Sequence, residues 1–265
     1  MDIPEELIEN LRSNDTVLFI GAGISITAGL PSWSDLFQPL AKSIGYPWPS
    51  SNLTTDHLLT VAQYYENRNG RHALVRYLMN NLDTAGKKLS EIHFLITQLP
   101  VKITFTTNYD DFIEKAYRET GQRTTVIVEN LEFAFSKEKD VKVVKLCGDI
   151  ARPDTIVVTK RDFNVFPTSH RDILEKLSDA LETKTVLFLG YSLKDPFINQ
   201  IWDVINFNFG KFQRLGYCVL FDADPMEAED MEKRNLRVIN LSDKGKSKSE
   251  LLSDWLKRLL YDLST

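Results

Sequence analysis

The chain has 265 residues and a mass of 30.4 kDa, and it is 43% hydrophobic and 26% charged, figures that fit one globular domain with or without a smaller insert and exclude disordered and fibrous proteins. Its net charge is −5, so we expect no direct nucleic-acid partner. No apolar run approaches the roughly 18 residues of a membrane span, and the start of the chain is acidic where a secretory signal would be basic. We therefore expect a cytoplasmic protein with no membrane partner. Two cysteines, Cys147 and Cys218, cannot build a disulfide scaffold or a four-cysteine zinc site, so we expect no metal.

Short β-branched runs alternate with helical patterns along the chain. The apolar spacing of residues 92–99 and of 252–263 predicts amphipathic helices, the second of which follows a capping box from Ser247 to Glu250. Strands alternating with helices favour an α/β fold with a Rossmann-like, doubly wound and mostly parallel sheet. The runs that predict buried strands are 17–20, 101–105, 141–144, 155–158, 185–189, 217–221 and 236–239.

Residues 34–99 interrupt this alternation, because they carry helical patterns and no convincing strand. We predict a single domain over residues 1–265 with a smaller helical insert at 34–99. Such an insert would fold over the carboxyl ends of the strands, where parallel sheets of this kind bind ligands.

A glycine-rich turn directly follows the first predicted strand. Gly21 and Gly23 would let backbone amides approach a pyrophosphate, and Ser25 could add a hydroxyl donor. Position 26 is Ile26 where the dinucleotide fingerprint requires a third glycine, and no P-loop lysine follows. A simple glycine turn after a strand therefore remains an equal alternative.

Three further polar turns follow predicted strands. Residues 106–110 carry Asn108 and Asp110, which could hold a ribose or a water, or could only form a turn and cap a helix. Residues 145–150 carry Cys147, and residues 188–196 carry a glycine and a serine. Because parallel strands end at the same edge of a sheet, the four turns together indicate one site.

The same residues form a recognisable set. The segments Gly-Ala-Gly-Ile-Ser (21–25), Gly-Leu-Pro (29–31), Thr-Asn-Tyr-Asp (107–110), Lys-Leu-Cys-Gly-Asp (145–149) and Leu-Gly-Tyr-Ser-Leu (189–193) resemble the Sir2 (sirtuin) superfamily, in order and spacing, from about residue 17 to 239. They are most similar to its bacterial branch of NAD-depleting antiphage proteins. The resemblance implies an NAD⁺ glycohydrolase, which splits NAD⁺ into nicotinamide and ADP-ribose.

The resemblance also implies a role for each matching residue, with Asn108 as the residue that positions water or ribose for chemistry at the C1′ carbon. The implied contacts are Gly21, Ala22, Gly23 and Ser25 along the pyrophosphate and nicotinamide ribose, Pro31 and Trp33 beside the nicotinamide, Asn108 and Asp110 in the nicotinamide pocket, Gly190, Tyr191 and Ser192 on the phosphates or adenosine ribose, and Asp222 near the adenosine.

Two departures from the family pattern leave alternatives open. Residues 148–155 leave no room for the zinc module of deacylating sirtuins, which disfavours a protein deacylase. Cys147 stands where the family has a histidine, and cysteine is a poorer hydrogen-bonding group with an ordinary pKa near 8.5 rather than about 6.5. A general base contributes about 10²–10⁴-fold, so its loss slows the reaction without forbidding it. The alternative is a non-catalytic NAD⁺ or ADP-ribose-binding subunit; whether Cys147 is natural tuning or an engineered inactivation is open.

Expectations about partners rest on the resemblance. Domains of this branch assemble as homo-oligomers or with a second protein, such as a HerA-like ATPase or a short Argonaute. Because 265 residues leave no room for a separate sensor domain, we expect a trigger in trans, or oligomerisation through the helical insert and the helix of Trp255. The expected ribose site has no arginine cluster, which favours NAD⁺ over NADP⁺.

Overall fold

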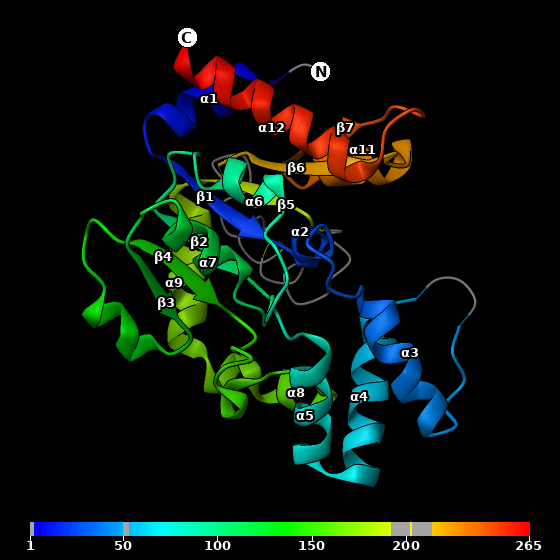
Figure 1. Ribbon diagram of the computed structural model, residues 1–265. Helices are drawn as coiled ribbons and strands as arrows, with labels where there is room; N and C mark the ends of the chain where they lie inside the picture. The colour runs from blue at the N-terminus through cyan, green and yellow to red at the C-terminus, as the bar shows by residue number, and fades with distance from the viewer. Residues whose placement is uncertain (1–2, 50–52, 192–201, 203–213) are drawn as a thin grey trace.

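A computed structural model describes residues 3–49, 53–191, 202 and 214–265 (Figure 1). Seven parallel strands form one sheet in the order β3-β4-β2-β1-β5-β6-β7, with β1 at its centre. The predicted α/β fold with a Rossmann-like, doubly wound sheet is confirmed. The strands are β1 (Thr16–Ile20), β2 (Ile103–Thr106), β3 (Thr124–Ile127), β4 (Val141–Lys145), β5 (Thr185–Leu189), β6 (Gly216–Phe221) and β7 (Leu236–Leu241).

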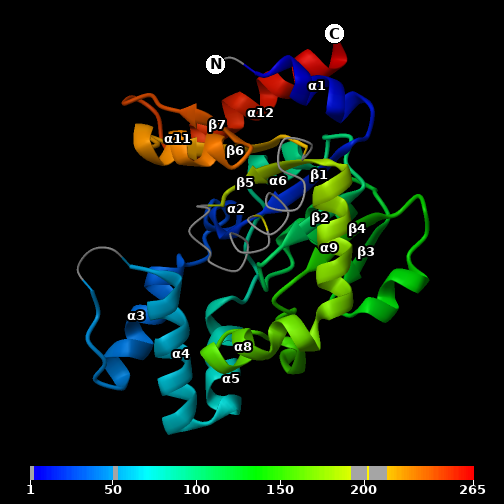
Figure 2. The same cartoon turned by 180° about the vertical axis from the view of Figure 1, so that it is seen from behind.

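Helices cover both faces of the sheet, as the opposite views of Figures 1 and 2 show. One face packs against α1 (Glu5–Arg12), α6 (Glu91–Ile96), α7 (Phe112–Glu119) and α12 (Lys248–Ser264). The other face packs against α9 (Arg171–Thr183) and α11 (Pro225–Lys233), whereas α8 (Lys160–Ser169) lies beyond the carboxyl ends of the strands beside α4 (Thr55–Asn69). The capping box predicted at Ser247 begins α12. Across the described ranges, no helix is both long enough and apolar enough to cross a membrane.

Strand β1 carries apolar side chains on both faces of the sheet, so both faces must be buried by helices. Its side chains alternate, so Leu18 and Ile20 join the cluster with α1, α6 and α12, whereas Val17 and Phe19 join the cluster with α9. Phe19 stacks on Phe188 of β5 with ring centroids 5.2 Å apart. Each such side chain stabilises the fold by about 1.5–3 kcal/mol when it is fully buried. The uninterrupted apolar runs of the sequence therefore correspond to strands buried on both sides.

Three helices between β1 and β2 lie beyond the carboxyl ends of the strands (Figure 1). They are α3 (Trp33–Ser43), α4 (Thr55–Asn69) and α5 (Arg71–Asn81), and capping boxes at Ser32 and Thr54 begin the first two. Helix α4 packs against α3, α5 and α8, whereas α6 packs against α12 and α7 beside the sheet. The helical residues of this stretch thus lie in two places, and the boundaries 34–99 of an insert stay a prediction.

Two strand predictions differ from the structure. The strand predicted at 155–158 is wrong: Pro153–Thr155 form a 3₁₀ turn, η2, and the residues after it are buried without joining the sheet. The amide of Val157 donates to the carbonyl of Cys147 (2.9 Å), so this apolar run is buried by packing beside a loop. Conversely, the sequence analysis did not predict β3 at the sheet edge, because this strand has only four residues and most of them are half-buried.

Candidate active site

The turns after β1, β2, β4 and β5 meet at the carboxyl edge of the sheet and border a cavity of about 380 Å³. Helices α3, α4 and α8 form the opposite wall, so the helical stretch does cover this edge. None of the described residues in its lining carries a formal charge. The lining comprises Ala22, Gly23, Ile26, Ser32, Trp33, Ser34, Phe37, Thr55, Leu58, Leu59, Thr107, Tyr109, Cys147, Val158, Phe163, Gly190 and Tyr191.

A smaller hollow of about 20 Å³ adjoins the cavity. The two share Ala22, Trp33 and Tyr109, and the Trp33 and Tyr109 rings meet edge to face with centroids 5.7 Å apart. The hollow contains the most polar of the predicted residues. Its lining adds Ser25, Leu30, Pro31, Leu36, Leu82, Asn108 and Asp110.

Asn108 is held in a fixed position by two neighbouring elements. Its amide nitrogen Nδ2 donates to Ser25 Oγ (3.1 Å), and its backbone amide donates to Thr106 Oγ1 (3.0 Å). Thr106 in turn donates to the carbonyl of Ile20 at the end of β1 (2.7 Å). Only 3% of Asn108 is exposed, and its Oδ1 has no hydrogen-bond partner in the structure. An unsatisfied buried acceptor costs about 1–3 kcal/mol, so the bare Oδ1 calls for an explanation.

Asp110 completes this buried group. Its Oδ2 accepts from Ser25 Oγ (2.8 Å), and its Oδ1 accepts from the backbone amide of Phe112 at the start of α7 (3.2 Å). Burial raises the pKa of the Asp110 carboxyl, although these two hydrogen bonds and the charge of Lys145 act in the opposite direction. The bond to Phe112 closes the predicted turn, whereas Asp110 does not cap the helix, because the N-cap residue of α7 is Asp111 and no side chain caps it.

The glycines of the first turn are explained by close packing. The amide of Gly21 donates to the Leu189 carbonyl and that of Gly23 to the Gly190 carbonyl, both at 2.9 Å. A Cβ at Gly21 or Gly23 would lie 2.5 or 2.7 Å from the Gly190 oxygen. Gly190 itself has φ +64°, and a Cβ there would lie 2.7 Å from Ile24. These two amides are thus engaged inside the protein, and glycine permits the turns after β1 and β5 to touch.

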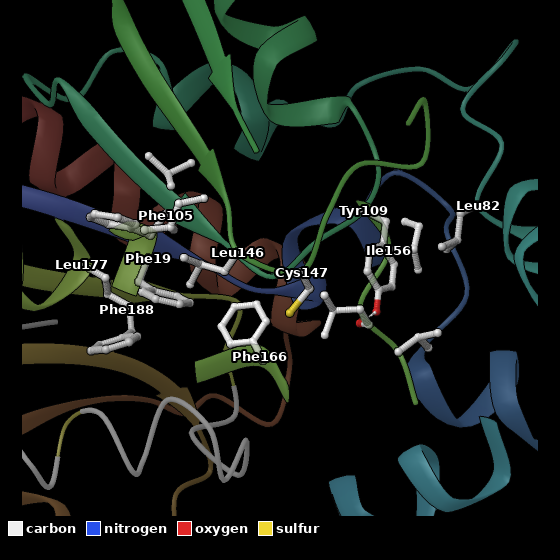
Figure 3. Close-up of a cluster of buried hydrophobic side chains, with 14 of the residues drawn as sticks. Phe19, Leu82, Phe105, Tyr109, Leu146, Cys147, Ile156, Phe166, Leu177 and Phe188 are labelled. Carbon is white, nitrogen blue, oxygen red and sulfur yellow. Dashed lines mark hydrogen bonds between the residues drawn. The ribbon is translucent and has the colours of Figure 1, made fainter. Parts of the chain in front are cut away.

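Cys147 lies in the cavity wall, in the turn after β4. It is 4% exposed, and Figure 3 shows its sulfur turned toward the ring of Phe166 of α8. Its carbonyl accepts from Val157, which joins the turn to the buried loop after η2. The residue at the family's histidine position therefore faces the cavity, but no histidine is among the lining residues.

Not every predicted residue joins this group. Gly21 and Asp222 are outside both linings, and Asp222 accepts from Ser242 Oγ (2.7 Å) beyond β6. Ser192 lies outside the described residues. Pro31, Trp33, Gly190 and Tyr191 line one hollow or the other. Within the described part of the chain, no three His, Cys, Asp or Glu side chains gather in a way that could hold a metal ion.

Sequence reasoning missed one residue of the site and one residue directly behind it. Tyr109 lines both hollows, and its hydroxyl donates to the Val157 carbonyl (2.7 Å). Lys145 is fully buried behind the turn, where its Nζ donates to Glu114 Oε1 (2.8 Å), Asp149 Oδ2 (3.0 Å) and the Tyr109 carbonyl (3.2 Å). The signal for Lys145 was its place inside an apolar run, where a lysine needs buried partners.

A doubly wound parallel sheet with a cavity outside the carboxyl ends of its central strands defines the class of open α/β proteins, in which ligands bind at that edge. Within that class, residues 102–239 match the model of the SIR2-like domain. The chain belongs to the SIR2-like family, as the motifs of the four turns predicted.

Several proteins with more specific names are similar to this chain. A protein named NAD(+) hydrolase ThsA from Acinetobacter baumannii is 31% identical over 273 residues, covering 98% of this chain and 55% of that protein. One of the same name from Cytobacillus dafuensis is 33% identical over 215 residues, covering 81% and 42%. A protein named defense-associated sirtuin 2 from Bacillus subtilis is 25% identical over 253 residues, covering 89% and 24%. The chain spans about half the length, or less, of these relatives.

Proposed function

We propose that the chain is an NAD⁺ glycohydrolase that releases nicotinamide and ADP-ribose from NAD⁺, with Asn108 as its central catalytic residue. The observation that carries the proposal is the buried Oδ1 of Asn108, which has no hydrogen-bond partner in the structure and belongs to a residue that lines the hollow beside the cavity. The similarity to proteins named NAD(+) hydrolase supports the same substrate.

The geometry suits cleavage of the bond between nicotinamide and ribose. That reaction passes through a ribose with positive charge at C1′, which nearby fixed dipoles and carboxylates stabilise. In our proposal Asn108 Oδ1 holds the ribose or the attacking water, and ionised Asp110 supplies negative charge nearby. Trp33 and Tyr109 form a wall that keeps other water out of the hollow.

Product analysis of the purified chain with NAD⁺ tests this proposal. We expect nicotinamide and ADP-ribose in equal amounts, without any peptide acceptor, and no release by Asn108→Ala. Addition of an acetyl-lysine peptide distinguishes the deacylase alternative: peptide-dependent release with loss of the acetyl group would contradict a glycohydrolase. Asn130→Ala is a matched control, because the Asn130 amide donates to Asp172 at an exposed position and Asn130 lines neither hollow of the site.

A second candidate function rests on Cys147. A non-catalytic subunit that binds NAD⁺ or ADP-ribose would retain the cavity but lack a base, and no histidine lines either hollow. Cys147→His separates the two candidates. We expect it to raise nicotinamide release by about 10–100-fold if the site is otherwise competent. A variant that binds NAD⁺ and releases nothing, in a chain whose parent is also silent, would favour the binding subunit.

The relatives suggest where the reaction is used. We propose that the chain acts in the cytoplasm as part of an antiphage NAD⁺-depletion system, because one relative carries the name defense-associated sirtuin and others the name NAD(+) hydrolase. Homo-oligomerisation and control by a partner in trans, such as a HerA-like ATPase or a short Argonaute, belong to the same proposal. Light scattering with and without NAD⁺ tests the first part; a monodisperse monomer in both conditions would contradict it.

A further inference from the structure

A buried ionic cluster lies directly behind the site. Lys145 of β4 is fully buried, and its ammonium group contacts Glu114 of α7 and Asp149 of the turn after β4, both also buried. Burying an ion pair often stabilises a fold no more than apolar side chains of the same size would. The cluster therefore calls for an explanation other than stability.

The third bond of the cluster points to the site. Lys145 Nζ donates to the carbonyl of Tyr109 (3.2 Å), the residue between Asn108 and Asp110. The same carbonyl accepts from the amide of Ile150 (2.9 Å), two residues after the glycine of the β4 turn. One oxygen thus joins the turn that carries Asn108 to the turn that carries Cys147, and Lys145 is the charged donor to it.

We propose that Lys145 is a positioning residue for the reaction: its ammonium group fixes the turn of Asn108 through the Tyr109 carbonyl and supplies the buried positive charge that acts on Asp110. This inference rests on the proposed function and deepens it. Lys145 touches no substrate in this role, because it lines neither hollow. It acts through Asn108 and Asp110.

The charges around the cluster define its pH behaviour. Glu114 and Asp149 act on Lys145, and their attraction raises the pKa of its ammonium group against the effect of burial. Burial raises the pKa of Glu114, whose Oε2 has no hydrogen-bond partner in the structure. Among the residues that the structure describes, Lys145 and Asp111 are the charges that act on Asp110, and of these two Lys145 favours its ionised form.

Replacing Lys145 alone would leave two buried carboxylates uncompensated, so the test uses the pair Lys145→Met with Glu114→Gln. This pair removes one positive and one negative charge and keeps the formal charge of the cluster. We measure the Asp110 carboxyl by NMR titration of ¹³C-labelled aspartate, assigned with Asp110→Asn. We expect the Asp110 midpoint to rise by about one pH unit, kcat for nicotinamide release to fall roughly tenfold, and KM for NAD⁺ to stay within about twofold.

Two controls isolate Lys145. Glu114→Gln alone keeps the lysine and should not raise the Asp110 midpoint, and Lys246→Met removes a surface lysine whose partner is Asp254. If the methionine pair does not fold, Lys145→Gln with Glu114→Gln offers polar side chains at both positions, and the same shift is expected.

The outcomes separate this proposal from the proposed function. A folded double variant with an unchanged Asp110 midpoint would overturn the role of Lys145, whatever its activity. A parent chain and a Cys147→His variant that both bind NAD⁺ and release no nicotinamide would contradict the glycohydrolase, while the carboxyl titration would still decide whether Lys145 controls the charge of Asp110.

Discussion

The glycine turns after β1 and β5 and the polar turn after β2 lie at one edge of the sheet, yet they differ in what their side chains and amides are free to do. The amides of Gly21 and Gly23 are bonded to the β5 turn, and added Cβ atoms would collide there. In the polar turn, Asn108 keeps a buried oxygen without a partner. Motif residues of one family can thus serve packing in one turn and leave a buried polar atom unbonded in the next.

Two buried polar groups of the molecule differ in the same way. Asn108 Oδ1 and His93 Nε2 both lack partners, but only Asn108 lines a hollow of the site. His93 faces the ring of Phe112, with centroids 5.4 Å apart. Asn108 therefore borders the candidate site, whereas burial of the His93 ring beside Phe112 favours a neutral imidazole in the core.

The largest expected effect concerns Gly190→Ala. Its φ of +64° and the 2.7 Å approach of a Cβ to Ile24 together should lower the free energy of unfolding by about 3 kcal/mol, or Tm by about 6–12 °C. Gly29→Ala is the matched control, because φ is +86° there but nothing lies within 4 Å. It should cost about 1 kcal/mol. Equal losses by thermal denaturation would contradict the packing role of the β5 turn.

The next effect is the loss of protein stability at low pH that the protonation of His93 causes. Burial lowers the pKa of His93 to about 4 from its ordinary 6.5, so the unfolded chain takes up the proton first. Stability from this group is complete above pH 6.5 and is lost as pH falls toward 4, by about 3 kcal/mol in total. His93→Gln keeps a residue suited to the capping box of Ser90 and should remove this loss.

Urea denaturation at pH 7 and at pH 4.5 measures the effect, with His57→Gln as control. His57 occupies the same position in the exposed capping box of Thr54. If both variants follow the parent's pH dependence, His93 is not the neutral structural group described above.

Asp110→Asn gives a smaller but more specific effect. Because the folded pKa of Asp110 is raised, its ionisation costs stability as pH rises through that pKa, and asparagine removes the cost. The variant should be at least as stable as the parent at pH 8. Its rate of nicotinamide release should be about tenfold lower than the parent's and should no longer decrease as the pH is lowered. If the rate of the variant decreases at low pH as the parent's does, a group other than Asp110 causes that decrease.

Part of this site could be predicted from the sequence because parallel strands end at one edge. That rule brought four turns together and gave the cavity its place. The bond of Ser25 to Asp110 joins residues 85 positions apart, and no spacing rule gives such a contact. The buried run at 155–158 was mistaken for a strand because burial alone does not reveal hydrogen bonding. Lys145 was missed because its partners come from a helix and two turns.

The most direct test of the account is the rate of nicotinamide release by Asn108→Ala at saturating NAD⁺. Asn108 donates only to Ser25 and Thr106 within the described structure, so the variant should fold. We predict a loss of at least about 100-fold in kcat with NAD⁺ affinity by calorimetry within a few-fold of the parent. An active parent whose Asn108→Ala variant releases nicotinamide at the same rate would contradict the central claim.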